Sequence, residues 1–202
     1  ALSYIVLTTV LLLAFLFIFY PLFVSVTTKL SPTVFAKKIA KVALFGFSTS
    51  SSAATLPMNI ETAEKELGVS EEIASFILPL GMTINMDGTA LMQVVATIFI
   101  AGVAGYTVHL PQLILIGLLA VIASVGTPAA PGAGAIILFT ILSGVGFTNP
   151  IALSVYALIL AINRPIEMLV TALNVTGDTA CAMVVCKSEN SLNEEVFNTV
   201  SK

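Results

Sequence analysis

The sequence from Ile73 to Cys186 carries almost no charge. The charged side chains within it are Asp87, Arg164, Glu167 and Asp178. Hydrophobic residues make up 57% of the 202 residues and charged residues only 9%, whereas a soluble domain has about 25% charged residues. So little polar surface cannot cover a water-soluble globule, and we expect an integral membrane protein in contact with lipid. The formal net charge of −3 argues against a nucleic-acid partner.

The first apolar run is long enough to cross a bilayer. Residues 2–28 carry no charged side chain, and a transmembrane helix needs about 20 apolar residues. No basic segment precedes the run, as it would in a signal peptide, and no Met begins it, so we expect the C-terminal part of a longer protein. The run is followed by Lys29, Lys37, Lys38 and Lys41. The positive-inside rule places that end in the cytoplasm.

Two clusters of small and polar residues interrupt the later apolar segments. Residues 48–57 and 124–134 are each flanked by short helical runs and followed by a long segment with polar residues inside it. Irregular backbone at membrane depth is tolerated only where it lines a protein cavity, and paired interruptions are typical of a transporter's midplane site. The pattern predicts an all-α membrane protein of transmembrane helices, some discontinuous, with two re-entrant helical hairpins.

These patterns divide the chain into six expected segments, with no soluble domain between them. They are a transmembrane helix at 1–30, re-entrant hairpin 1 at 31–72, a broken transmembrane helix at 73–106, re-entrant hairpin 2 at 111–147, a last transmembrane helix at 150–187 and a cytoplasmic tail at 188–202. The Gly-Ala-Gly-Ala run at 132–135 indicates a bendable tip for hairpin 2, suited to a gate.

Asp87 and Asp178 have neighbours that suit a bound cation. Asn85 and Thr89 lie beside Asp87, and Asn174 lies one helical turn before Asp178. A charge at bilayer depth costs roughly 2.5–3.5 kcal/mol, and carboxylate, amide and hydroxyl oxygens are the ligands of hard metal cations. The pattern therefore predicts cation binding at both acids.

The alternative is that the acids of this stretch form buried ion pairs or helix caps. Arg164 is the one Lys or Arg available there, so it neutralises at most one acid of the three. We therefore also expect a functional role for Glu167.

Enzyme chemistry finds little support in the sequence. A nucleophile in the serine run at 50–52 would need a base, and the single histidine, His109, lies in a short loop between apolar segments. Polar hairpin tips instead offer backbone N–H groups and hydroxyls to a bound carboxylate. We expect a protein that is not an enzyme. An ion channel is a further alternative, but a selectivity filter repeats its polar groups around an axis.

Four motifs occur in register along the whole chain: Ser-Ser-Ala-Ala-Thr-Leu-Pro at 51–57, Asn-Met-Asp-Gly-Thr at 85–89, Gly-Thr-Pro-Ala-Ala-Pro-Gly-Ala-Gly at 126–134 and Asn-Val-Thr-Gly-Asp at 174–178. Together they resemble the glutamate transporter family, the dicarboxylate/amino acid:cation symporters. The resemblance runs from the family's sixth membrane helix to its eighth and leaves out the first five. It implies a sodium-coupled symporter with an elevator mechanism, assembled as a homotrimer among lipids in the plasma membrane, with a cytoplasmic C-terminus.

The resemblance implies two or three bound Na⁺ ions. One site would use Asn85, Asn174, Asp178 and the carbonyl of Gly81. A second would use Asp87 with Asn85 and be completed by a helix outside this sequence. A third would use the backbone carbonyls of Thr83, Ser124, Val125 and Thr127.

The resemblance also implies an amino acid site. The substrate carboxylate would meet Ser52, Asn174 and the tip amides near Ala129, and its amino group would meet Glu167 and Thr171. The other implied lining residues are Ser50, Ser51, Thr89, Ala130, Gly134 and Val170.

Departures from the family pattern concern the substrate. Members that take acidic substrates carry Arg one turn before the Asn of Asn-Val-Thr-Gly-Asp, and here that residue is Val170. Loss of a bidentate Arg–carboxylate pair predicts a neutral amino acid. The alternative is that Arg164 reaches the pocket and retains acidic amino acids or dicarboxylates. Gln93 stands where proton-coupled animal members carry Glu, and Asp178 is retained where some proton-driven members carry Asn. Both favour sodium.

Overall fold

The computed structural model describes residues 1–199, so the last three residues of the predicted tail lie outside it. The first apolar run forms one continuous helix. It comprises α1 (Leu2–Ala14), a π-helical turn (Phe15–Phe19) and α2 (Tyr20–Thr28). The run ends at Lys29, which adopts a left-handed conformation with φ of 65°.

The next two helices, α3 (Pro32–Thr49) and α4 (Ser52–Lys65), form what we call the first helix pair. Pro32 suits the start of α3, because proline has no N–H to leave unsatisfied in a first turn. Ser50 turns the chain in the left-handed region, with φ of 51°. Ser51 then caps α4 by accepting a hydrogen bond from the N–H of Ala54, at 3.2 Å.

Helices α5 (Glu71–Ile84) and α6 (Asp87–Val103) follow one another with a break at Asn85 and Met86. The φ and ψ angles of Asn85 are −96° and 83°, outside the helical region. This break frees backbone groups near Asp87, at the start of α6.

Helices α7 (Leu110–Val125) and α8 (Ala133–Val145) form the second helix pair. Its tip, residues 126–132, reaches α8 through Gly132, whose φ of 84° requires glycine in practice. Gly146, at φ of 78°, ends α8.

The last segment differs from the single helix expected at 150–187. The structure has α9 (Pro150–Ile162) and α10 (Arg164–Ser188), separated at Asn163, and a short α11 (Glu194–Asn198). Pro165 explains the break, because proline has no N–H to continue α9 and fits only the first turn of a new helix.

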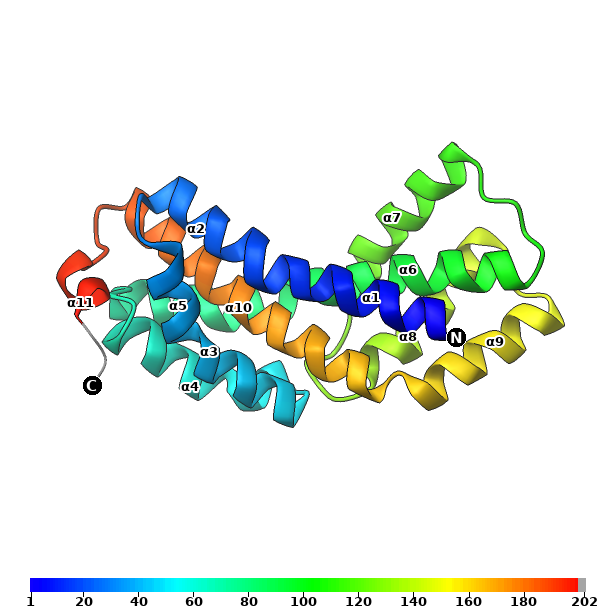
Figure 1. Cartoon of the computed structure of the whole chain (residues 1–202), viewed down its shortest axis with the longest axis horizontal. Coiled ribbons are helices and arrows are strands. Elements are labelled where there is room, and N and C mark those ends of the chain that lie inside the picture. The colour runs from blue at the N-terminus through cyan, green and yellow to red at the C-terminus, as the bar shows by residue number, and fades with distance from the viewer. Residues whose placement is uncertain (200–202) are drawn as a thin grey trace.

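Helix α10 runs along the centre of the molecule and contacts α2, α3, α4, α5 and α6 (Figure 1). The N-terminus lies toward one end of the molecule and α11 toward the other (Figure 1), and α1 contacts α6 and α10. One buried apolar cluster joins α2, α3, α5 and α10, and a second joins α6, α7, α8 and α9. The two clusters lie on either side of the helix breaks and tips.

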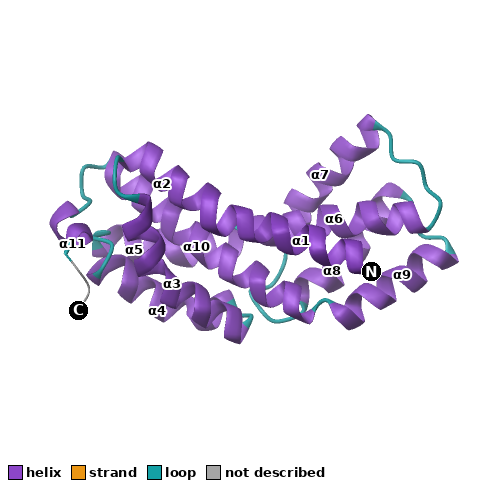
Figure 2. Cartoon of the chain, viewed as in Figure 1, coloured by secondary structure: helices purple, strands orange, loops and turns teal. Residues whose placement is uncertain are grey.

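All regular elements in the described part of the chain are helices (Figure 2). Three are long and apolar enough to cross a membrane: Leu2–Thr28, the Glu71–Val103 run and Arg164–Ser188. The predicted all-α membrane fold is thus confirmed. Whether the two helix pairs are re-entrant remains a prediction.

Candidate functional site

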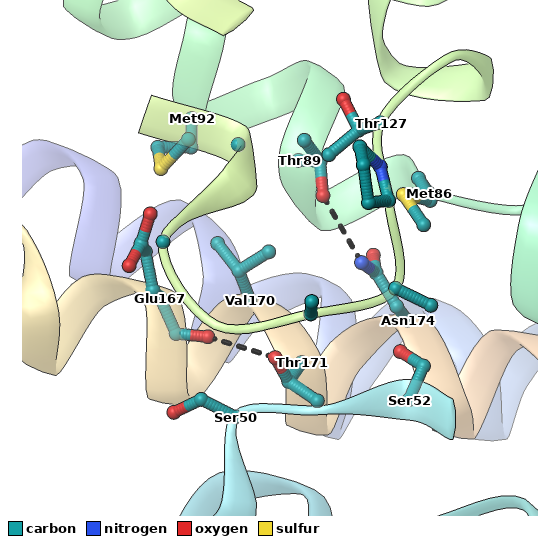
Figure 3. Close-up of a pocket in the computed structure, with 15 residues that line it drawn as sticks. Ser50, Ser52, Met86, Thr89, Met92, Thr127, Glu167, Val170, Thr171 and Asn174 are labelled. Atoms are coloured by element: carbon teal, nitrogen blue, oxygen red, sulfur yellow. Dashed lines mark hydrogen bonds between the residues drawn. The ribbon is translucent and has the colours of Figure 1, made fainter. Parts of the chain in front are cut away.

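A pocket lies where the two pair tips meet the start of α6 and the middle of α10 (Figure 3). Its lining comes from four separate parts of the chain. The lining residues are Ser50, Ser52, Met86, Thr89, Met92, Thr127, Pro128, Ala129, Ala130, Gly132, Gly134, Glu167, Val170, Thr171 and Asn174. The predicted substrate residues are all in this set except Ser51.

The pocket is small in this conformation. About 30 Å³ of its interior can be occupied by the centres of water-sized spheres. This is room for a water molecule or two. An amino acid therefore requires the walls to move apart or rearrange.

Glu167 is the only charged residue among the fifteen that line the pocket. It is 8% exposed, and its Oε1 accepts a hydrogen bond from the N–H of Ala135 at 3.2 Å. That N–H belongs to the first turn of α8, where amide groups have no partner within the helix. Glu167 thus joins α10 to the second helix pair and presents a negative charge to the pocket.

Val170 lines the pocket, whereas Arg164 does not. Arg164 is exposed and forms no salt bridge with any of residues 1–199. It therefore neither neutralises Glu167 by direct contact nor reaches the pocket in this conformation.

Asn174 ties α10 to the start of α6. Its Oδ1 accepts from the N–H of Gly88 at 2.8 Å. Its Nδ2 donates to Oγ1 of Thr89 at 3.1 Å (Figure 3). A Cβ on Gly88 would lie 3.0 Å from this Oδ1, so glycine allows the close approach.

The three serines of the first tip have different surroundings. The hydroxyl of Ser50 is buried and has no hydrogen-bond partner among the described residues. Ser52 is buried and lines the pocket. Ser51, expected in the lining, instead donates its hydroxyl hydrogen to the carbonyl of Ala129 at 2.9 Å, while its oxygen accepts from the N–H of Ala54 and caps α4. It joins the two tips.

The predicted sodium residues around Asp178 lie together. Asp178 is 2% exposed, and its Oδ1 accepts from Nδ2 of Asn85 at 2.9 Å. A Cβ on Gly81 would lie 2.9 Å from the same oxygen, so the carboxylate packs directly on the end of α5. No base of residues 1–199 forms a salt bridge with Asp178. A buried carboxylate without a basic partner suits a hard cation. Asn85 turns its N–H₂ group toward Asp178, so the amide would have to rotate for its oxygen to act as a ligand.

Asp87 differs from the expectation of a buried carboxylate, because it is exposed in the described chain. Its Oδ2 accepts a hydrogen bond from the hydroxyl of Tyr20, which is buried on α2. Gly177 holds this region close: a Cβ there would lie 2.3 Å from the Tyr20 hydroxyl and 2.7 Å from Nδ2 of Asn85. Sequence reasoning missed Tyr20, since nothing distinguishes it within its apolar run.

The residues of the third predicted sodium site lie at the ends of α5 and α7, which contact each other. Ser124 and Thr127 are buried, while Thr83 and Val125 are exposed. The three hydroxyls bond to carbonyls of their own segments, at 2.7 to 2.9 Å. Each hydroxyl oxygen keeps its lone pairs when it donates, so these contacts neither add to nor remove the backbone carbonyls predicted as ligands.

The sequence pattern of the sodium:dicarboxylate symporter family matches residues 1–188. The chain belongs to this family. It is similar to an excitatory amino acid transporter of Caenorhabditis elegans, with 38% identity over 165 residues, covering 82% of this chain and 32% of the relative. It is also 38% identical to excitatory amino acid transporter 2 of Homo sapiens over 169 residues (83% and 29%) and to human transporter 5 over 173 residues (84% and 30%).

Family membership confirms the resemblance drawn from the four motifs, and relatives that are transporters by name agree with a protein that is not an enzyme. The chain spans about a third of the length of these curated relatives. Sequence reasoning also missed four pocket-lining residues, Met86, Met92, Pro128 and Gly132. Met86, Pro128 and Gly132 lie within the recognised motifs and Met92 just after one, but they carry no charge or ligand group that would single them out.

Proposed function

We propose that this chain forms the substrate- and cation-binding part of a sodium-coupled symporter for neutral amino acids. The observation that carries the proposal is the single charge of the pocket. Glu167 faces the cavity with hydroxyls, tip backbone and apolar side chains around it. An ammonium group would pair with Glu167, and the substrate carboxylate would meet Ser52 and the tip amides near Ala129.

The absence of a positive charge from the pocket lining favours a neutral side chain on the substrate. An acidic amino acid would bring a second carboxylate beside Val170, with no cation in the lining to pair it. Leaving a buried charge unpaired costs several kcal/mol. Acidic amino acids or dicarboxylates remain the competing class, because the family name and the names of the relatives indicate them.

Sodium coupling is supported by Asp178. Its buried carboxylate lacks a salt-bridge partner among residues 1–199 and lies against Asn85 and Gly81. We propose two or three Na⁺ sites, at Asp178, at Asp87 and between the ends of α5 and α7. Asp178→Asn should weaken sodium dependence sharply, since the amide removes the charge.

We further propose that the second helix pair is the gate and that the two pairs are re-entrant. The gate would widen the small pocket, and the whole binding part would then move as an elevator within a plasma-membrane homotrimer. The lysines after α2 support a cytoplasmic position for that end. Helix α11 lies at the same end of the molecule as the end of α2 (Figure 1). The C-terminal tail would therefore be cytoplasmic too.

A competition assay on the protein reconstituted in liposomes tests the substrate class. Neutral amino acids should compete in the presence of sodium, and aspartate, glutamate and succinate should not. Glu167→Gln should weaken amino acid binding about 10- to 100-fold, because a hydrogen bond to a charged group is lost. Val170→Arg should shift preference toward aspartate or glutamate. Tight binding of acidic substrates by the wild type, without any response to neutral ones, would overturn the proposal.

A further inference from the structure

One peptide group at the start of α8 is held from both of its polar atoms. The carbonyl oxygen of Gly134 accepts from Nε2 of Gln93, on α6, at 3.0 Å. The N–H of Ala135 donates to Oε1 of Glu167, on α10, at 3.2 Å. The two atoms belong to the same planar, trans peptide unit and point in opposite directions. The unit is therefore clamped between α6 and α10.

The side chains around this peptide pack closely against it. A Cβ on Gly134 would lie 3.2 Å from Cε of Met92 and 3.2 Å from Cγ2 of Thr89. The first turn of α8 thus rests on α6 at the depth of the pocket. Any outward movement of the second helix pair must break the contacts of Gln93 and Glu167 together.

Gln93 is a fully buried polar residue on α6 with one polar atom left without a partner among the described residues. It is 0% exposed, and its Oε1 has no hydrogen-bond partner among the described residues. Rotating the amide would bring Oε1 against the Gly134 carbonyl, so the orientation is set by that contact. A buried acceptor without a partner costs stability, and an apolar residue would avoid this cost. Breaches of such rules are expected at functional positions.

We propose that Gln93 is a positioning residue for the substrate site. By fixing the 134–135 peptide, it presents the Ala135 N–H to Glu167 and orients the carboxylate that receives the substrate ammonium. Closure of the second helix pair and readiness of Glu167 are thereby linked through one peptide group. The inference rests on the proposed function for its substrate, but the clamp itself exists without ligand.

The test compares two substitutions on α6. Gln93→Met keeps the side-chain length and removes both the donor to Gly134 and the unpartnered oxygen. Thr97→Val is the matched control: Thr97 is also 0% exposed and lies one turn away, and its hydroxyl donates at 2.8 Å to the carbonyl of Gln93, within α6. It removes one buried hydrogen bond that lies within α6, not one to the second helix pair.

Amide hydrogen exchange over residues 132–138 of the ligand-free protein is the first readout. Gln93→Met should raise exchange there, and Thr97→Val should not. Glu167→Gln keeps an acceptor for the Ala135 N–H and should leave exchange unchanged, whereas Glu167→Leu should raise it. In the Gln93→Met, Glu167→Leu double variant the two increases should not add, since both act on one peptide group. If Gln93→Met does not fold, Gln93→Asn, one methylene shorter, should raise exchange in its place.

Substrate affinity is the second readout, measured with the neutral amino acid that competes best. Gln93→Met should weaken it about two- to tenfold, the range for one lost hydrogen bond. Unchanged exchange and affinity in Gln93→Met, or equal changes in Thr97→Val, would overturn the inference and leave the proposed function standing. If the wild type binds no amino acid, the proposed function fails, and the exchange comparison still decides the clamp.

Discussion

The first helix pair lies along α10 and buries a broad face against it, whereas the second helix pair leaves most of α7 uncovered. In α3 the buried residues are Phe35, Lys38, Ile39, Val42, Ala43 and Gly46. In α7, of similar length, they are only Ile116, Ala120 and Ser124. Helix α7 also diverges from the rest of the molecule toward its outer end (Figure 1).

The two tips also differ in which side chains hold them. The first tip is closed by its own side chains: Ser51 caps α4, and Oγ1 of Thr55 donates to the carbonyl of Ser51 at 2.8 Å. The second tip accepts a hydrogen bond from Ser51 of the first tip, and the first turn of α8 that follows it is held by Gln93 and Glu167. A segment that depends on distant partners can be released when those partners change, so the comparison indicates a fixed wall and a movable one.

The largest expected effect lies at the base of the first helix pair. The amine of Lys38, only 7% exposed, donates to the carbonyls of Glu66 at 2.8 Å, Val196 at 3.1 Å and Phe197 at 2.7 Å. Lys38→Met should lower the free energy of unfolding by about 3–5 kcal/mol, because three carbonyls lose a charged donor. Chemical unfolding in detergent micelles measures the change.

Lys37→Met is the control for Lys38→Met. Lys37 is the neighbouring lysine and is exposed, so its replacement should change the unfolding free energy by less than about 0.5 kcal/mol. Equal losses in the two variants would mean that the base of the first helix pair is not the fixed element described above.

The fold could be predicted from sequence where the signal is a change of composition. Residue composition changes clearly at three places: the apolar run at 2–28, the break near Asn85 and the small-residue run at 126–134. The break at Asn163 escaped, although Pro165 marks it, because apolar residues continue on both sides. The burial of Lys38 could not be predicted, since sequence does not show that α11 and the loop after α4 supply its acceptors.

The site could be predicted as far as its motifs extend. Glu167, Asn174 and Asp178 are polar residues in an apolar helix, so each is conspicuous. The role of Gln93 could not be found, because its partner is a backbone carbonyl 41 residues away. The tie between Ser51 and Ala129 escaped for the same reason, since backbone acceptors leave no mark in a sequence.

A pair of glycine substitutions sharpens the comparison with a smaller effect. A Cβ on Gly46, in α3, would lie 3.1 Å from Cγ2 of Val175, whereas one on Gly117, in α7, would have no atom within 4 Å. Gly46→Ala should cost about 1–3 kcal/mol through overpacking. Gly117→Ala should be neutral or stabilise the protein by up to about 1 kcal/mol, since alanine favours helix. Thermal unfolding measures both, and a similar loss in each would contradict the open packing of α7.

The smallest expected effect concerns the contact between the tips. Ser51→Ala removes the hydrogen bond to the Ala129 carbonyl and the cap of α4 together, and should cost about 1 kcal/mol of unfolding free energy. Ser51→Thr keeps a hydroxyl for both contacts and serves as the control. Spin labels at Ala53 and Ala130, in a background with Cys181 and Cys186 replaced by alanine, report the distance between the tips.

The distance distribution separates the two contributions of Ser51. If the bond to Ala129 holds the second tip, Ser51→Ala should broaden the distribution in the absence of substrate, and Ser51→Thr should not. A loss of stability with an unchanged distribution would assign the cost to the α4 cap alone. The second helix pair would then be held through the first turn of α8, by Gln93 and Glu167, without help from the first tip. In that case Gln93→Met should broaden the same distribution more than Ser51→Ala does.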